Sequence, residues 1–145
     1  MPHDPLAIVL RLRRKSLESA QQELARATAA ETDAGALARL AETMIGDEQN
    51  AACAMTASDG AVEAFARWLP GARQRAEAAR AMLERAQAEV GRTRATLSAA
   101  RTALESVETL AQQRKHALDQ EEARKEEREM EEIYRARAVS DDQYS

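Results

Sequence analysis

The sequence predicts an all-α protein, folded as a long antiparallel two-helix coiled-coil hairpin with an overhanging C-terminal helix. Aromatic residues make up only 3 % of the 145 residues, whereas alanine occurs 33 times, which is typical of long helices rather than of a globular core. Five glycines and three prolines are too few for the turns of a β-sandwich or a doubly wound sheet. Apolar residues also recur every seven positions over most of the chain. We therefore expect residues 1–145 to form a single coiled-coil domain.

The first helix is expected over about residues 5–57. Asp4 is a suitable N-cap, and Pro5 fits the first helical turn, where a missing N–H has no cost. Two rows of apolar residues follow at heptad spacing. The first row holds Leu10, Leu17 and Leu24, and the second holds Ala20, Ala27, Ala34 and Ala41. Large residues then continue at Leu37 and Met44, so we expect the first row to move to these two positions.

Two turn signals separate the halves of the chain. Ser58-Asp59-Gly60 is one, and Pro70-Gly71 is the other. Because the heptad phase continues across Pro70, we favour a reversal at about 57–61 and interpret Pro70-Gly71 as a kink. A reversal at 69–72 stays open as the alternative, since it would place the basic residues 11–15 opposite the acidic residues 121–132.

The second helix is expected over about residues 61–138, with residues 139–145 as a tail. Its two heptad rows span about eight heptads without a slip. One row holds Val62, Leu69, Ala76, Leu83, Val90, Leu97, Leu104, Ala111 and Leu118, and the other holds Phe65, Ala72, Ala79, Ala86, Thr93, Ala100 and Val107. From residue 119 to 129 only Ala123 is apolar, so this part of the helix is expected to overhang the first helix.

Charge and motifs exclude several classes of function. The net charge of −4 is the sum of −3 over residues 1–60, +4 over 61–118 and −5 over 119–145, a pattern that fits helix pairing better than nucleic-acid binding. The longest apolar run, residues 6–10, is far shorter than a membrane span, and the single cysteine forms no internal disulfide. No phosphate loop, nucleophile motif or metal-ligand spacing is present. We therefore expect a cytoplasmic protein that is not an enzyme, with no cofactor, no metal and no nucleic-acid partner.

Three segments are candidate partner surfaces. The first combines the apolar residues 6–10 with the basic residues that follow them. The second surrounds Trp68, the only tryptophan, which falls beside the heptad rows and is expected to be partly exposed. The third is the overhang at residues 114–134, which is densely charged but carries a short apolar patch at Met130, Ile133 and Tyr134.

These segments resemble the FliJ family, the flagellar export stalk proteins, which are related to YscO of type III secretion. The resemblance lies in the leucine-rich start that runs into arginines at residues 6–14, the Glu-Ala-rich heptads at 17–24, the stretch at 105–110, the basic pair Arg114-Lys115, and the charged run at 121–133. It implies a non-catalytic export component shaped like the stalk of rotary ATPases. The implied partners are the export ATPase FliI, the cytoplasmic domain of the export gate FlhA, and export chaperones. The implied location is peripheral, at the export apparatus of the inner membrane.

Two sets of binding residues follow from this resemblance. The set expected to bind the ATPase comprises Leu6, Leu10, Arg11, Arg13, Arg14, Arg114, Lys115, Met130 and Ile133. The set expected to bind the export gate comprises Phe65, Trp68 and Leu69. A YscO-like stalk of a virulence secretion system, a generic coiled-coil adaptor or scaffold, and a protein held at a membrane surface by its N-terminal helix stay open as alternatives.

Overall fold

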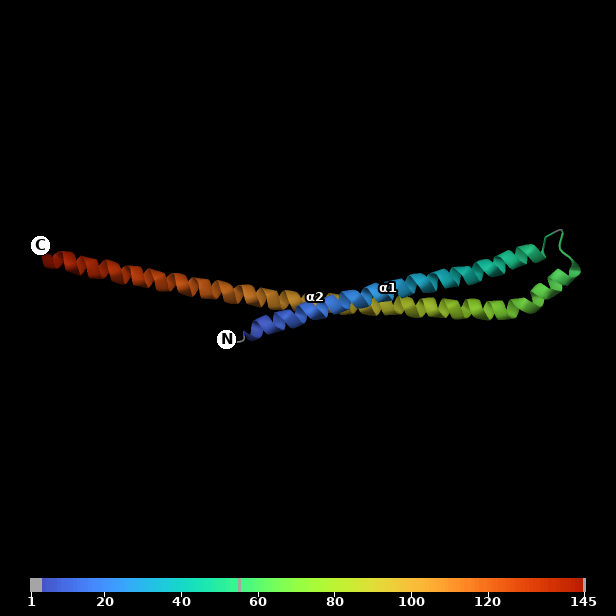
Figure 1. Ribbon diagram of the computed structural model, residues 1–145, viewed down its shortest axis with the longest axis horizontal. Helices are drawn as coiled ribbons and strands as arrows, with labels where there is room; N and C mark the ends of the chain where they lie inside the picture. The colour runs from blue at the N-terminus through green and yellow to red at the C-terminus, as the bar shows by residue number, and fades with distance from the viewer. Residues whose placement is uncertain (1–3, 55, 145) are drawn as a thin grey trace. The chain divides into compact units, whose positions relative to one another are not determined.

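Two long α-helices make up the structure, a computed structural model that describes residues 4–54 and 56–144 (Figure 1). Helix α1 spans Pro5–Ala52, and helix α2 spans Asp59–Tyr144. No strand occurs among the described residues. The predicted all-α class is therefore confirmed.

The chain divides into two compact units, which we describe separately. The central unit comprises Lys15–Arg101 and so contains most of α1 and the first half of α2. The terminal unit comprises Met1–Arg14 and Thr102–Ser145, and its described residues contain the first turns of α1 and the second half of α2.

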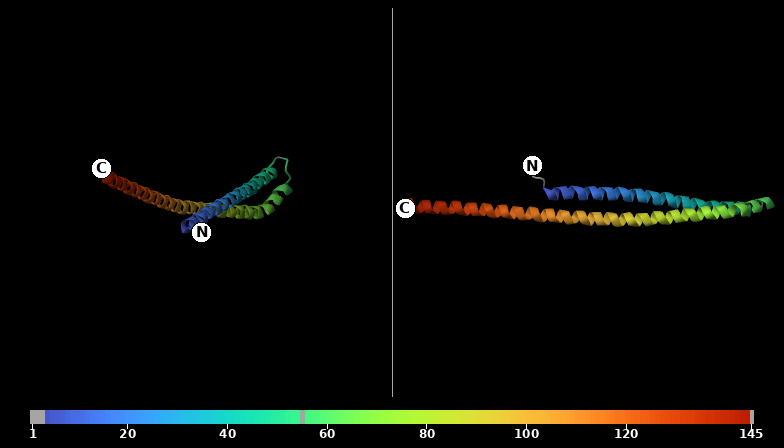
Figure 2. Two further views of the ribbon diagram at one scale, coloured as in Figure 1. Left: turned by 60° about the vertical axis from the view of Figure 1, so that its left-hand side comes forward. Right: turned by 90° about the horizontal axis from the view of Figure 1, so that it is seen from below.

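In the central unit, α1 and α2 pack against each other in antiparallel orientation. A Cβ atom placed on Gly35 would lie 3.8 Å from Cδ1 of Leu83, and Arg80 Nε donates a hydrogen bond to Glu42 Oε1 at 2.7 Å. Residue numbers therefore rise along α1 as they fall along α2, and Figure 2 shows from two further sides how the chain turns back between the helices. Alanine supplies most of the buried residues of this unit, which are Ala20, Ala27, Ala34, Ala38, Ala52, Ala72, Ala76, Val90, Thr93 and Leu97.

Thr93 is the most buried residue of the central unit, at 2 % exposure. Its single hydroxyl proton is shared between the backbone carbonyls of Glu89 and Val90, each 3.0 Å from Oγ1. A polar group buried without a partner would be costly, and these local bonds remove that cost. A threonine can therefore replace an apolar residue between the helices.

The terminal unit begins at the N-terminus of α1, which Asp4 caps. The Asp4 carboxylate accepts a hydrogen bond from the backbone N–H of Leu6 at 3.1 Å, and the same oxygen lies 2.9 Å from Arg114 Nη1. Leu104 is buried in this unit, whereas every described residue from 112 to 144 is exposed. The predicted N-cap is confirmed, and it also ties the start of α1 to α2.

The heptad rows predicted for α2 are confirmed over most of their length. All of its buried residues lie on the two rows, namely Ala72, Ala76, Val90, Thr93, Leu97 and Leu104. The rows are shorter at both ends than expected, because Val62 and Leu118 are 53 % and 56 % exposed. Helix α1 extends only from Pro5 to Ala52. Val62 therefore lies beyond its C-terminal end and Leu118 beyond its N-terminal end, so α1 buries neither side chain.

The expectation that the first row of α1 moves to Leu37 and Met44 is wrong. Both side chains are about half exposed, at 54 % and 49 %. The row instead keeps its spacing of seven through Ala38, Ile45 and Ala52, of which the two alanines are buried and the isoleucine is half-buried. Close helix packing favours small residues here, so side-chain size does not identify the buried row.

The helix ends also differ from the expected ranges. Helix α1 stops at Ala52 rather than near residue 57, and α2 starts at Asp59, whose carboxylate suits the positive end of the helix dipole. Pro70 lies inside α2. Because proline has no N–H, the carbonyl of Ala66 lacks its helical hydrogen-bond partner. Figure 1 shows that α2 bends in this green first part. Residues 139–144, expected as a tail, continue α2, because no glycine or proline follows Gly91 to end the helix.

Two glycines inside the helices offer a test of this architecture. A Cβ atom added at Gly46 or Gly91 would meet nothing within 4 Å. We expect Gly46→Ala and Gly91→Ala each to raise the free energy of unfolding by about 0.5–1 kcal/mol, because alanine loses less backbone entropy on forming a helix. Urea unfolding followed by circular dichroism measures the gain. Gly60→Ala, in the first turn of α2, is the control with a smaller gain, and a loss of stability at both interior sites would contradict the helix assignment.

Candidate partner-binding surfaces

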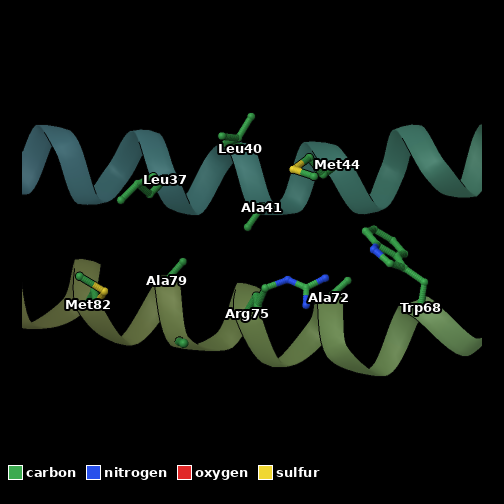
Figure 3. A pocket seen from close by; sticks show the side chains of 10 residues that line it. Leu37, Leu40, Ala41, Met44, Trp68, Ala72, Arg75, Ala79 and Met82 are labelled. Atoms are coloured by element: carbon green, nitrogen blue, oxygen red, sulfur yellow. The ribbon is translucent and has the colours of Figure 1, made fainter.

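The central unit contains an apolar groove between α1 and α2, which we call the central groove. It has a volume of about 350 Å³ and is shown in Figure 3. Large side chains from both helices stand along it, and alanines form its floor. The lining residues are Leu37, Leu40, Ala41 and Met44 from α1, and Trp68, Ala72, Arg75, Ala78, Ala79 and Met82 from α2.

Trp68 lies at one end of the central groove and is half-buried. Its ring centroid is 5.9 Å from that of Phe65, with the ring planes tilted by 38°, a favourable distance for an aromatic pair. Trp68 and Phe65 also line a second hollow beside Glu48 and Ala52, next to the end of α1. Phe65 and Leu69 are half-buried on the heptad rows. The structure therefore brings together Phe65 and Trp68 of the three residues expected to bind the export gate, and Leu69 follows Phe65 by one turn of α2.

Arg75 is the only charged residue among the described residues that line the central groove. No carboxylate of the described residues lies within 4.0 Å of its guanidinium, in contrast to Arg80, which pairs with Glu42. Arg75 lies close to Gly71, where an added Cβ would be 3.4 Å from Nη1. Figure 3 shows the arginine side chain extended along the groove.

The residues expected to bind the ATPase all lie in the terminal unit, but they do not form one cluster. Leu6 and Leu10 are half-buried and occupy the side of α1 that packs, whereas Arg11, Arg13 and Arg14 are exposed. Arg114 pairs with Asp4, and Lys115 beside it is exposed. Met130 and Ile133 are 55 % and 50 % exposed and are neighbours on one face of α2. About 24 Å of helix separates Arg114 from Met130, so the apolar patch is distinct from the basic residues.

One exposed ion pair shifts the pKa values of its partners. Arg92 Nε donates to Glu89 Oε2 at 3.0 Å, and this hydrogen bond lowers the pKa of the Glu89 carboxyl and raises the pKa of the Arg92 guanidinium. A lowered carboxyl pKa stabilises the fold above the ordinary pKa of glutamate, and the effect is lost as the pH falls through the lowered value. Both groups are exposed, so the pair supports α2 locally and indicates no acid–base chemistry.

The described residues contain no group of three or more histidine, cysteine, aspartate or glutamate side chains placed to hold a metal ion. Within residues 4–54 and 56–144, no helical stretch combines the length and the apolar character needed to cross a membrane.

Comparison with known protein families gives a match that covers nearly the whole chain. A family described as Flagellar FliJ protein matches residues 2–141, nearly the whole chain. The chain belongs to the FliJ family. No curated protein and no solved structure matches it significantly. Membership in the FliJ family implies a role in flagellar protein export, in which the family is a non-enzymatic component.

Four large residues of the central groove in this FliJ-family chain do not follow from the heptad rows. Leu40 and Met82 lie outside the rows, and Leu37 and Met44 line the groove instead of joining the buried row. A signal was present in the spacing. Leu37, Leu40 and Met44 share one face of α1 beside the alanine row, and Trp68, Arg75 and Met82 precede the heptad row of α2 by one position at every heptad.

Proposed function

We propose that this FliJ-family protein is a non-catalytic stalk and escort component of the bacterial flagellar export apparatus. It binds the export ATPase FliI, promotes assembly of the ATPase ring, contacts the cytoplasmic domain of the export gate FlhA, and escorts export chaperones. It acts in the cytoplasm, peripherally at the export apparatus of the inner membrane. The family match over residues 2–141 carries this proposal.

The proposed form is a long antiparallel coiled-coil hairpin whose α2 overhangs α1. Two observations support it. The helices are antiparallel where they pack in the central unit, and every described residue from 112 to 144 is exposed. A charged helix with a short apolar patch suits insertion into the opening of a ring-shaped partner, because its exposed face stays hydrated until the partner covers it.

The ATPase contact is proposed for the terminal unit, through Leu6, Leu10, Arg11, Arg13, Arg14, Arg114, Lys115, Met130 and Ile133. The three N-terminal arginines are exposed and have no ion pair within the described residues, so their charges are available to carboxylates of a partner. The gate contact is proposed for Phe65, Trp68 and Leu69, where a half-buried tryptophan borders two hollows.

The ATPase contact is tested by reversing two charges. We expect the double variant Arg13→Glu, Arg14→Glu to lose capture of purified FliI by at least about tenfold, because two attractive contacts become repulsive. The control is Arg94→Glu with Arg101→Glu, which changes the net charge equally at exposed positions of α2. Equal capture by the two double variants would rule out the proposed ATPase contact.

The gate contact is tested by removing the indole. We expect Trp68→Ala to weaken binding of the purified cytoplasmic domain of FlhA by about tenfold or more, since buried aromatic anchors dominate many interfaces. Tyr144→Ala, at an aromatic residue that is 91 % exposed, is the control. Titration calorimetry measures both affinities, and an unchanged affinity of the Trp68 variant would refute this contact while leaving the ATPase contact untouched.

A further inference from the structure

We propose that the central groove binds an amphipathic helix of a protein partner, and that this helix carries a carboxylate opposite Arg75. The inference goes beyond the gate contact, because it specifies the chemistry of the bound segment and extends the surface onto α1. It does not depend on which export protein supplies the helix.

The walls of the central groove are apolar and accessible. Leu37, Leu40 and Met44 of α1 are 54 %, 56 % and 49 % exposed, and Met82 of α2 is 53 % exposed. Large apolar side chains gathered on one face of a chain rich in charge mark an interaction surface. Methionine and leucine side chains also adapt to the shape of an incoming apolar face.

The shape of the central groove favours a helix as the occupant. Trp68 and Met82 are 14 positions apart on α2, which corresponds to about 21 Å, or about four turns of a helix laid alongside. Both walls are helices, and apart from the carbonyl of Ala66 before Pro70 their backbone groups bond within each helix, so no strand edge is available to an extended peptide. The alanine floor at Ala41, Ala72 and Ala79 allows a third helix to approach closely and place side chains between the walls.

Arg75 determines the charge of the occupant. Within residues 4–54 and 56–144 it is the only charged residue of the lining, and no carboxylate there pairs with it. A helix that covers the central groove removes water from this guanidinium, and an unpaired buried charge would oppose binding. A carboxylate on the incoming helix forms a charge-assisted hydrogen bond instead. The stable occupant therefore has an acidic residue on its apolar face, level with Arg75.

The test uses full-length protein and a designed peptide. The probe is a helical peptide of about 18 residues, long enough for four turns, with leucines at i, i+3, i+7 and i+10 and a central glutamate. A second peptide has lysine in place of that glutamate. Trp68 is the only tryptophan, so a shift of its fluorescence to shorter wavelength reports that a peptide covers the indole, and Leu40, which lines only the central groove, separates this groove from the second hollow.

We expect the glutamate peptide to bind at least about tenfold more tightly than the lysine peptide. Arg75→Glu should reverse this preference, and Leu40→Glu should abolish binding of both peptides. Leu118→Glu, at an equally exposed leucine outside the groove, should bind like the unaltered protein. Circular dichroism melts of all variants establish that the helices remain folded.

Three results would overturn the inference. They are no fluorescence change with either peptide, equal affinity for both peptides, and unchanged binding by the Leu40 variant. Sedimentation of the full chain tests a second copy as the occupant. Self-association that Leu40→Glu removes would assign the central groove to a dimer and refute the proposed partner helix. The assay contains no gate protein, so its outcome is separate from that of the FlhA titration.

Discussion

Val90→Asp is expected to unfold most of the central unit. Val90 is 3 % exposed and lies on the heptad row of α2, one turn before Thr93. The substitution removes apolar contacts and buries a carboxylate with no partner, which together lower the free energy of unfolding by more than about 4 kcal/mol. Because domains of this size are only marginally stable, cooperative thermal unfolding by circular dichroism should be lost or shifted far down.

Val62→Asp is the matched control, because Val62 lies on the same row of the same helix and is 53 % exposed. An acidic residue in the first turn of α2 interacts favourably with the helix dipole. We expect the free energy of unfolding of this variant to stay within about 0.5 kcal/mol of the unaltered protein. If the two variants unfold alike, the assignment of Val90 to the packed side of α2 is wrong.

Ala34→Leu is expected to destabilise the central unit, although leucine is more apolar than alanine. Ala34 is 7 % exposed, and a Cβ atom added at its neighbour Gly35 would already be in van der Waals contact with Leu83, at 3.8 Å. A larger side chain there forces the helices apart and costs about 1–3 kcal/mol. Urea unfolding measures the loss.

Ala36→Leu tests whether overpacking is the cause. Ala36 is exposed on the same turn of α1, and alanine and leucine differ little in helix propensity. We expect this variant to change the free energy of unfolding by less than about 0.5 kcal/mol. A stabilised Ala34 variant would mean that the contact between the helices has spare room.

The two heptad rows of α2 could be predicted because large and small apolar residues alternate there with charged ones. Val90, Leu97 and Leu104 stand out from their polar neighbours, and all three are buried. The buried row of α1 could be predicted only up to Leu24, the last leucine of that row. Beyond Leu24 the buried positions are mostly alanine, which also occurs on exposed positions such as Ala36, so composition no longer distinguishes the two faces.

The candidate surfaces were predictable to different degrees. Trp68 could be singled out because a lone tryptophan beside a heptad row contrasts with its surroundings. The α1 side of the central groove could not be predicted. Leu37 and Met44 are large apolar residues of the kind expected in a buried row, and only the packing of the helices shows that alanines are buried instead. The roles of the terminal and gate-facing residues stay predictions until their partners are tested.

The alanine contact also has a consequence for how the helices of the central unit stay aligned along their length. On α1 the buried residues Ala20, Ala27 and Ala34 are identical and seven positions apart, so sliding this helix by one heptad would place the same small side chain at the same level again. The alanines alone therefore do not define the register. That task falls to the few unequal contacts, namely Gly35 under Leu83 and the pair of Glu42 with Arg80, and to the short connection from Ala52 to Asp59.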